Sequence, residues 1–586
     1  MIPILPARVG LPSRYRSNLW LLAAIGLYVT FAATTVQSVG VVGEVALGWM
    51  KGPPVPVRIV LDEPPVDHAL GPLRAQQTRP IERIQLGSIH LPLAINAYTG
   101  AAPDWPARIV HAVTGSTRIV RWLHLLLGVG LIVATFQFLR RHAGAAAAVA
   151  SIFVLASRWD FVFYRSVLGG TEAVLVGASL AMIWALWSRR WRGSPNGLVG
   201  IALAVGLGLH AKLTFVVFAA AVTLAAIVLR RDRPAMGPPS RSSSLRTVLA
   251  LFTPLLPILV ANVHQSWIGS PHLRSHDHPS LQLARVWGAL TGQSAPTRES
   301  LHNIVAWLGD PLAFLARAYG VDAAPEAPWL FVGLGWGITS LGLLLVWRNQ
   351  HATPREALLR LCSLVLLFGV SGLLLVARDL HHLATLSVVT AMVAGLAADQ
   401  LAGMWAPPRS IRRTLAALVL VSPWIASGGF QLAATDGLVT RIETPTFRED
   451  GQAALAAVIR NAHAERVWVA DYESMGALEL ALGDTPTEII HGWGAASRRA
   501  NTDRGTADFD IELLQAAMGD HLLTVQASAP MIYNFRTRGR GLKEKSLRAG
   551  VQLEEVGRLP DGQAVLYRVA PRPSEKPTSH QREASP

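Results

Sequence analysis

Cysteine is almost absent from this 586-residue sequence, which contains one, Cys362. A lone thiol excludes a disulfide within the chain and any cysteine-based metal site. Cys362 lies inside an apolar run, so we expect a buried and chemically inert side chain.

Charge is also scarce, since Asp, Glu, Lys and Arg make up 16% of the residues, whereas soluble domains carry about 25%. Acidic residues are the scarcer kind, with 38 Asp+Glu against 53 Lys+Arg and a formal net charge of +15. Nucleic-acid binding is one interpretation of that excess. The basic residues, however, form short clusters between apolar runs, as in the cytoplasmic loops of membrane proteins. We therefore expect a membrane protein without a nucleic-acid partner.

The 51% of hydrophobic residues is concentrated in about eleven runs, and crossing the hydrocarbon core takes roughly 20 apolar residues. The basic residues Arg8, Arg14 and Arg16 precede the first run as in a signal peptide, but the run is too long for one and indicates a retained span. The sequence predicts an α-helical polytopic membrane protein with spans at 18–40, 120–139, 143–158, 170–188, 197–210, 213–229, 246–263, 328–347, 357–377, 383–403 and 412–430.

The positive-inside rule orients these spans. With a cytoplasmic N-terminus, every arginine-rich cluster falls in a cytoplasmic loop; the clusters lie at 140–142, 189–192, 230–246, 347–360 and 407–413. The opposite face carries two long loops, 41–119 and 264–327, and the C-terminal tail. We expect a transmembrane domain over 1–430 in the cell (inner) membrane, with the C-terminal domain extracytoplasmic.

The tail has the pattern of a small α/β soluble domain over 441–570. Strands are predicted at 466–470, 488–490, 521–525 and 564–568, and helices at 474–482 and 511–518, an alternation typical of a layered α/β fold. Residues 571–586 are rich in Pro, Ser, Glu and Lys, a composition that predicts a disordered tail.

Carboxylates in the first long loop are the first candidates for chemistry. Glu44 follows the first span, and Asp62 and Glu63 come later in the same loop. A carboxylate at the membrane surface can act as general base toward an acceptor hydroxyl, or coordinate a divalent metal beside a phosphate. The alternative for each is an ordinary solvated loop charge.

Histidines gather in two places. His272, His276 and His278 surround Asp277 in the loop 264–327, a set that could bind zinc, although such crowding in an exposed loop more often holds no metal. His381 and His382 stand at the mouth of a late span, where they would contact a donor phosphate, an acceptor or only the interface.

Several short motifs follow one another along the transmembrane domain. His90-Leu91-Pro92-Leu93 is followed by Gly100 and then Arg108. Phe163-Tyr164-Arg165-Ser166-Val167 precedes Thr171-Glu172, and Leu203 to Gly208 precedes His210-Ala211-Lys212. Arg378 to Leu383 forms a polar turn before a late span. In this order they resemble the GT-C superfamily of membrane glycosyltransferases, particularly the protein-mannosyltransferase and aminoarabinose-transferase-like group (glycosyltransferase family 39-like).

The resemblance implies a lipid-linked donor, a polyprenyl-phosphate sugar, and transfer to a lipid, glycan or protein acceptor of the cell envelope. Arg165, Lys212 and Arg378 lie on the outer side in the predicted topology. Arginine suits bidentate contact with a phosphate and lysine a point-charge contact. We expect these three cations, with His381 and His382, to bind the donor phosphate; the alternative for each cation is a loop or snorkelling side chain.

One departure from the family pattern concerns the catalytic base. The family usually has an acidic residue, often Asp-Glu, just after its first span, whereas this chain has Gly43-Glu44-Val45 there and the pair Asp62-Glu63 arrives later. The base is therefore Glu44 by position, or Asp62 or Glu63 by residue type. No metal site is assigned, and a divalent metal ion stays an open alternative.

Two other functions compete with glycosyl transfer. Transporters have inverted repeats and mid-membrane charges, but here the charges fall near span ends and no repeat is visible. A non-catalytic scaffold, with an outer domain that binds envelope partners, stays open because the acidic pair is displaced.

Overall fold

A computed structural model describes most of the predicted spans and part of the C-terminal region. The residues described are 13–38, 83–86, 89–96, 99–114, 117–167, 170–194, 196–232, 241–260, 304, 306–312, 328–349, 353–376, 380–408, 410–439, 449–469, 478, 481–482, 485, 487–491, 511, 513–515, 517–525, 542–560 and 564–572. They fall into two compact units, the first extending to α19 and the second beginning at α20.

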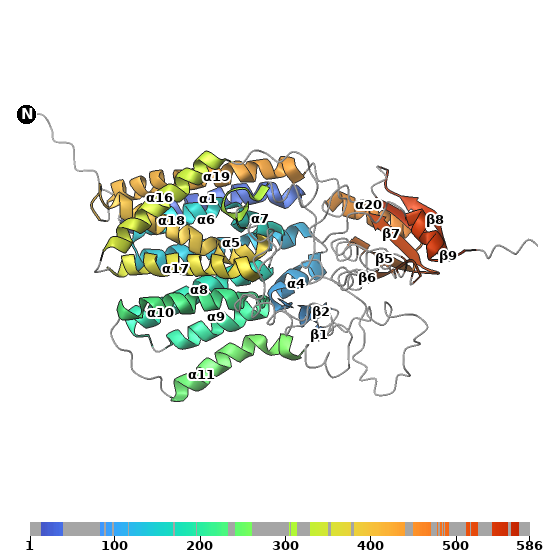
Figure 1. Ribbon diagram of the computed structural model, residues 1–586, viewed down its shortest axis with the longest axis horizontal. Helices are drawn as coiled ribbons and strands as arrows, with labels where there is room; N and C mark the ends of the chain where they lie inside the picture. The colour runs from blue at the N-terminus through green and yellow to red at the C-terminus, as the bar shows by residue number, and fades with distance from the viewer. Residues whose placement is uncertain are drawn as a thin grey trace, which may run out of the picture. The chain divides into compact units, whose positions relative to one another are not determined.

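The first unit is a bundle of helices (Figure 1). Its long helices are α1 (Ser13–Ser38), α5 (Thr117–His142), α6 (Ala145–Ser157), α8 (Gly170–Arg192), α9 (Gly197–Ala211), α10 (Phe215–Val228), α11 (Arg241–Phe252), α16 (Trp329–Arg348), α17 (Pro354–Val376), α18 (Ser387–Ala402) and α19 (Ile411–Val439). Shorter elements are α7 (Trp159–Val167) and the 3-10 helices η3 (Leu229–Asp232), η4 (Thr253–Leu255) and η6 (Leu380–Leu386).

Each predicted span overlaps one of these helices, and the span 246–263 overlaps α11 and the η4 turn that follows it. Within the described ranges, six helices are long and apolar enough to cross a membrane, and five further apolar helices are shorter. Large apolar side chains are exposed on the bundle, among them Val419 (70%) and Leu330 (71%); exposed apolar surface of this kind marks a face that contacts lipid or another protein. The fold class, a multi-pass helical membrane protein, is confirmed, while the number of spans stays a prediction.

Local sequence explains where α17 begins. Thr353 and Glu356 form a capping box: the Glu356 carboxylate accepts hydrogen bonds from the Thr353 backbone N–H (2.8 Å) and hydroxyl (3.0 Å), and the Glu356 N–H donates to the Thr353 hydroxyl (3.3 Å). These bonds satisfy backbone groups that a helix start leaves open. Pro354 occupies the first helical position, where its missing N–H costs nothing.

Helix α18 lies at the centre of the bundle and is buried almost throughout. It packs against α6, α19, α16 and α17. Small residues allow these close approaches, since a Cβ at Gly395 would lie 2.5 Å from the Ser151 backbone N of α6, and one at Gly342 would lie 2.8 Å from the Ala397 carbonyl oxygen of α18. Small-residue contacts are typical of helix packing in membranes.

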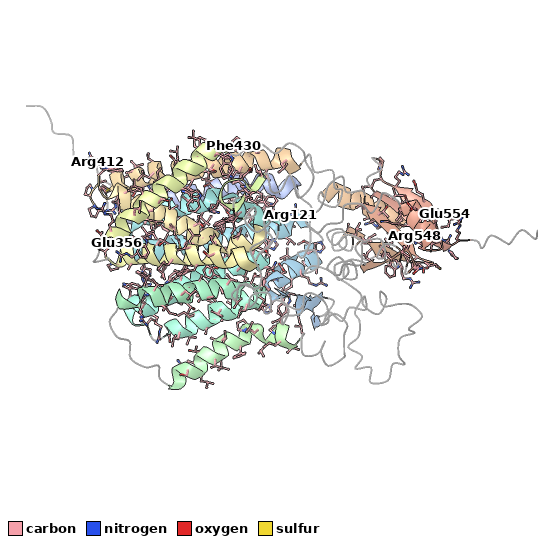
Figure 2. All side chains as sticks on the ribbon, in the orientation of Figure 1. Arg121, Glu356, Arg412, Phe430, Arg548 and Glu554 are labelled. Atoms are coloured by element: carbon pink, nitrogen blue, oxygen red, sulfur yellow. The ribbon has the colours of Figure 1, made fainter. Side chains whose placement is uncertain are left out.

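A buried charge cluster joins three helices at one end of the bundle. Asp399 of α18 accepts a hydrogen bond from Nε of Arg413 in α19 (2.6 Å) and pairs with Arg355 of α17. In Figure 2, Glu356 and Arg412, which begin the same two helices, lie at this end, while Arg121 of α5 lies toward the other. The predicted loops 347–360 and 407–413 therefore occupy the same end, as their common assignment to the cytoplasm requires.

The predicted loop 41–119 ends in regular structure that the sequence analysis did not predict. Strands β1 (Arg83–Leu86) and β2 (Ile89–Pro92) form an antiparallel pair, and β3 (Ala94–Asn96) pairs with β4 (Thr99–Gly100). The 3-10 helix η2 (Ala102–Asp104) then leads into α4 (Trp105–Thr114). Gly100 lies in β4, which packs against α9, and Arg108 lies in α4, which packs against α5.

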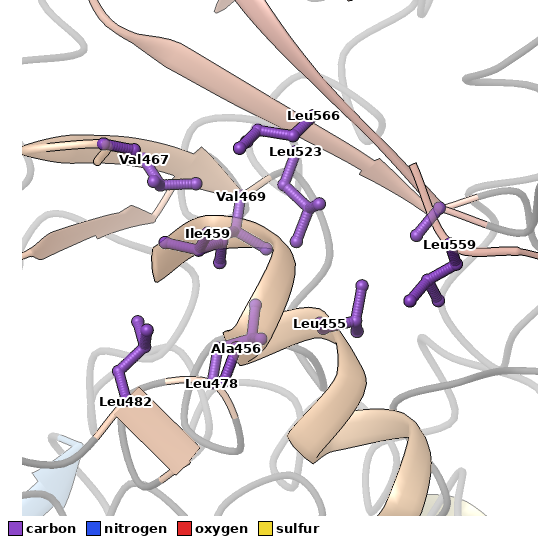
Figure 3. Packing of buried hydrophobic residues seen from close by; sticks show 12 residues of the cluster. Leu455, Ala456, Ile459, Val467, Val469, Leu478, Leu482, Leu523, Leu559 and Leu566 are labelled. Atoms are coloured by element: carbon purple, nitrogen blue, oxygen red, sulfur yellow. The ribbon is translucent and has the colours of Figure 1, made fainter. Parts of the chain in front are cut away.

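The second unit contains a five-stranded mixed sheet in the order β6-β5-β7-β9-β8, with β5 parallel to β6 and β7 and the rest antiparallel. Its elements are α20 (Glu449–Asn461), β5 (Arg466–Val469), β6 (Glu488–His491), β7 (His521–Val525), α24 (Leu542–Arg548), β8 (Val551–Arg558) and β9 (Ala564–Pro571). Leu455 and Ile459 of α20 pack on Val467, Leu523 and Leu566 of the sheet (Figure 3). The small α/β domain is confirmed; the limits 441–570 and the tail 571–586 stay predictions.

Candidate active site

The structure describes the predicted site residues unequally. Glu44, Asp62, Glu63 and Arg378 lie outside the described residues. Arg165 lies in α7, and His381 and His382 lie in η6, but only their backbones are described. Lys212 alone is described with its side chain.

Lys212 follows α9 directly and is 1% exposed. Its backbone is extended (φ −161°, ψ 132°), so the helix ends at Ala211, while its N–H still donates to the Gly208 carbonyl (2.9 Å). Burying an ammonium group costs several kcal/mol unless its surroundings compensate. A fully buried lysine at the end of an apolar helix is therefore a candidate functional cation.

The elements that carry the sequence motifs meet around the start of α8. Helix α8 packs against η2 and η6, α7 also packs against η6, and α9 packs against both α8 and β4. Segments near positions 100, 170, 210 and 381, far apart in the sequence, are thus neighbours in the fold. This arrangement brings the backbones of Arg165, His381 and His382 to the region that contains Lys212.

Buried acidic and polar side chains occupy the same region. Thr171, in the first turn of α8, donates a hydrogen bond from Oγ1 to Oδ2 of Asp104 in η2 (3.1 Å). Both residues are buried, as are the neighbouring Glu172 and, one turn after Asp104, Arg108 of α4. Carboxylates and cations at a shared span end are the groups that could hold a phosphate or its counter-ion, or move a proton.

His210 is the least satisfied polar group of this region. It is 3% exposed, and neither ring nitrogen has a hydrogen-bond partner within the described part of the chain. An unpaired buried polar group costs about 1–3 kcal/mol. A Cβ on Gly100 of β4 would lie 2.3 Å from its Cε1 atom, so only glycine fits there.

Sequence reasoning missed part of this arrangement. Arg108, Glu172 and His210 stand in the motifs that carry the family resemblance, yet were not singled out as site residues, and Asp104 stands in none of them. The detectable signal was an ionisable residue at the edge of an apolar run. No group of three or more His, Cys, Asp or Glu side chains suits a metal ion in the described ranges; the cluster from His272 to His278 lies outside them.

Two comparisons with known proteins bear on this site. The family model described as dolichyl-phosphate-mannose-protein mannosyltransferase matches residues 100–260, which include Asp104, Arg108, Glu172, His210 and Lys212. No curated protein sequence matches the chain.

Among solved structures, the chain is similar to ArnT from Cupriavidus metallidurans bound to undecaprenyl phosphate, at 14% identity and a TM-score of 0.52, over 95% of this chain and 98% of that one. The apo form of the same protein gives 13% identity and a TM-score of 0.49, over 94% and 98%. The apo oligosaccharyltransferase of Archaeoglobus fulgidus gives 12% and 0.49, over 97% and 76%. At these identities the first structure establishes a shared fold and no more.

Proposed function

We propose that this protein moves a sugar from a polyprenyl-phosphate donor to an acceptor of the cell envelope. The premise is that the family model and the fold support a GT-C superfamily membrane glycosyltransferase. Transfer takes place on the extracytoplasmic face in the predicted topology. The observation that carries the proposal is the buried Lys212 among buried carboxylates and Arg108, at the meeting point of α8, α9, η2 and η6.

Positively charged side chains explain how the donor phosphate would be bound. A phosphate near the bilayer surface needs positive charge, and departure of the lipid phosphate leaves negative charge on its oxygen. Fixed cations in a water-poor site stabilise that developing charge more strongly than water does. We assign Lys212, Arg165 and Arg378 to the donor phosphate, with His381 and His382 beside them. The undecaprenyl phosphate named in the ArnT structure is a ligand of the same chemistry.

Carboxylates explain how the acceptor hydroxyl would be deprotonated. A hydroxyl acceptor must lose its proton as it attacks, and a carboxylate within hydrogen-bond reach can take it. Glu44, Asp62 and Glu63 remain our candidates for that base. Asp104 suits a supporting role better, because one of its oxygens already accepts the Thr171 hydroxyl.

Substitution of Lys212 tests the proposal. In nanodiscs that contain the full chain, Lys212→Met should lower transfer from polyprenyl-phosphate sugars about 10- to 100-fold, since a charge-assisted hydrogen bond contributes about 1.5–3 kcal/mol. Inhibition by sugar-free undecaprenyl phosphate should weaken in parallel, and Lys212→Arg should restore part of both. Arg412→Met, an exposed cation at the other end of the bundle, is the matched control.

A Lys212→Met protein that keeps both transfer and inhibition within twofold of the wild type would remove Lys212 from the donor site. The same assay separates the base candidates, because Glu44→Gln, Asp62→Asn and Glu63→Gln should differ in kcat. If all three match the wild type, the base does not lie in the first long loop.

A further inference from the structure

A second buried polar cluster lines a pocket that the proposed donor site does not use. It lies where α6 passes into α7, against α19 and residues 307–311. The pocket is partly enclosed by these elements and partly open to its surroundings. Its lining combines indole rings with polar side chains: Arg158, Trp159, Asp160, Trp307, Trp424, Ser427 and Gln431.

The two charges in this pocket neutralise each other. Arg158 donates to both oxygens of Asp160, from Nε at 2.8 Å and from Nη2 at 2.9 Å. Trp307 adds a hydrogen bond from Nε1 to Oδ2 of the same carboxylate (2.8 Å). A buried bidentate pair of this geometry leaves little net charge, so the pocket offers no preference for a charged ligand.

Hydrogen-bonding capacity nevertheless remains on three of the lining groups. Among the described residues, Arg158 Nη1 and the Ser427 hydroxyl have no hydrogen-bond partner. Gln431 uses its Nε2 on the Gly309 carbonyl (3.1 Å), which leaves its amide oxygen available. The pocket thus presents donors and an acceptor to one ligand.

Rigid aromatic walls flank these groups. The Arg158 guanidinium lies 5.1 Å from the ring centre of Trp307 and 6.0 Å from that of Trp424. Trp424 donates from Nε1 to the Thr339 hydroxyl (3.3 Å), and Trp159 to the Thr435 hydroxyl (2.8 Å). Indole rings held in place offer apolar contact to the C–H groups of a ring-shaped ligand, while the polar groups suit its hydroxyls.

We propose that this pocket binds a neutral, hydroxylated sugar ring. A lipid phosphate would require a cation that is not already paired, and an acyl chain would leave the polar lining groups unsatisfied. The ring belongs either to the donor or to the acceptor. Binding as such is independent of the proposed transfer reaction, whereas the choice between donor and acceptor rests on it.

Direct binding tests the pocket. Saturation-transfer difference NMR on the full chain in nanodiscs, with a panel of neutral methyl glycosides, should detect binding to the wild type. Ser427→Leu fills the pocket from α19 and should abolish the signal. Ser427→Ala removes only the hydroxyl and should weaken binding about tenfold. Ser422→Leu, on an exposed position of the same helix, should bind like the wild type.

Three results would overturn the proposal: no glycoside binds the wild type, the Ser427 variants bind like the Ser422 control, or sugar-free undecaprenyl phosphate displaces the glycoside. A chain that binds glycosides but transfers no sugar would contradict the proposed function and leave the pocket assignment standing. Where transfer occurs, a raised acceptor KM in Ser427→Ala assigns the ring to the acceptor, and a raised donor KM assigns it to the donor.

Discussion

Gly100 and His210 lie 110 positions apart in the sequence and are in contact in the fold, next to the buried Lys212. A Cβ at position 100 would lie 2.3 Å from His210 Cε1 and 2.6 Å from the His210 carbonyl oxygen. The backbone oxygen cannot rotate away, so Gly100→Ala must move β4 and the end of α9 apart, and Lys212 directly follows α9. Since misplacement by about 1 Å can cost 100-fold in rate, we expect at least a tenfold loss of transfer and a lower unfolding temperature.

Two variants check this cause. Gly26→Ala in α1 adds a Cβ with nothing within 4 Å and should unfold at or above the wild-type temperature, because alanine favours a helix by about 1 kcal/mol over glycine. The double variant Gly100→Ala/His210→Ala removes the ring but not the carbonyl contact, so it should recover stability only in part. Full activity of Gly100→Ala would mean that β4 does not position Lys212.

The residue scale is where prediction from sequence was least complete. Lys212 and its motif could be found because a charge at the end of an apolar run is expensive and conspicuous. The Asp104–Thr171 hydrogen bond joins residues 67 positions apart, and no local pattern encodes such a pairing. Likewise, Arg158 and Asp160 stand in a local sequence typical of a polar turn, and that sequence does not predict the hydrogen bond from the distant Trp307.

Helix contacts depend on single glycines in a way that can be measured. Gly428 of α19 lies against the end of α6, where a Cβ would approach the Ser157 carbonyl oxygen to 1.8 Å. Gly428→Ala should therefore force the two helices apart and destabilise the protein by about 1–3 kcal/mol, the usual cost of overpacking. Its unfolding temperature in detergent measures the effect.

The adjacent glycine supplies the control. A Cβ at Gly429 would meet only the ring edge of Phe31, at 3.3 Å, and a side-chain tip can shift by a few tenths of an ångström. Gly429→Ala should change stability by less than about 0.5 kcal/mol. Equal effects at both positions would assign the loss to α19 itself rather than to its packing against α6.

At the scale of elements, the sequence predicted those whose pattern is strong. Apolar runs located every long helix of the bundle because crossing the hydrocarbon core requires them, and β5, β6, β7 and β9 were found at nearly their observed positions. Strand β8 was missed because Gln552, Glu554 and Glu555 interrupt its apolar residues. It forms one edge of the sheet, where charged side chains are expected because they discourage pairing with other chains. The hairpins within 83–100 were missed because their strands have only two to four residues.

At the scale of the whole molecule, the predicted cytoplasmic loops 347–360 and 407–413 lie at the same end of the bundle, as alternating spans require. Their common position does not say which end faces the cytoplasm. Arg412 and Glu356 share one end of the bundle (Figure 2). The arginine clusters predict that this end faces the cytoplasm, and the same rule predicts the first long loop and the C-terminal domain on the opposite side of the membrane. The proposed site requires this orientation, since a general base in the loop 41–119 must meet the donor on the face where transfer occurs.

Cysteine labelling decides the orientation, and the chain suits it because its one cysteine, Cys362, is fully buried. In spheroplasts, a membrane-impermeant maleimide should label Val60→Cys and Ala500→Cys without permeabilisation, but should label Arg412→Cys only after the membrane is opened. Unmodified wild-type chain gives the background from Cys362. If Arg412→Cys is labelled first, the bundle is inverted, and Lys212 with its neighbouring carboxylates would lie on the cytoplasmic side. A soluble nucleotide sugar would then be the accessible donor, because such donors occur in the cytoplasm, and the cations would no longer indicate a lipid phosphate.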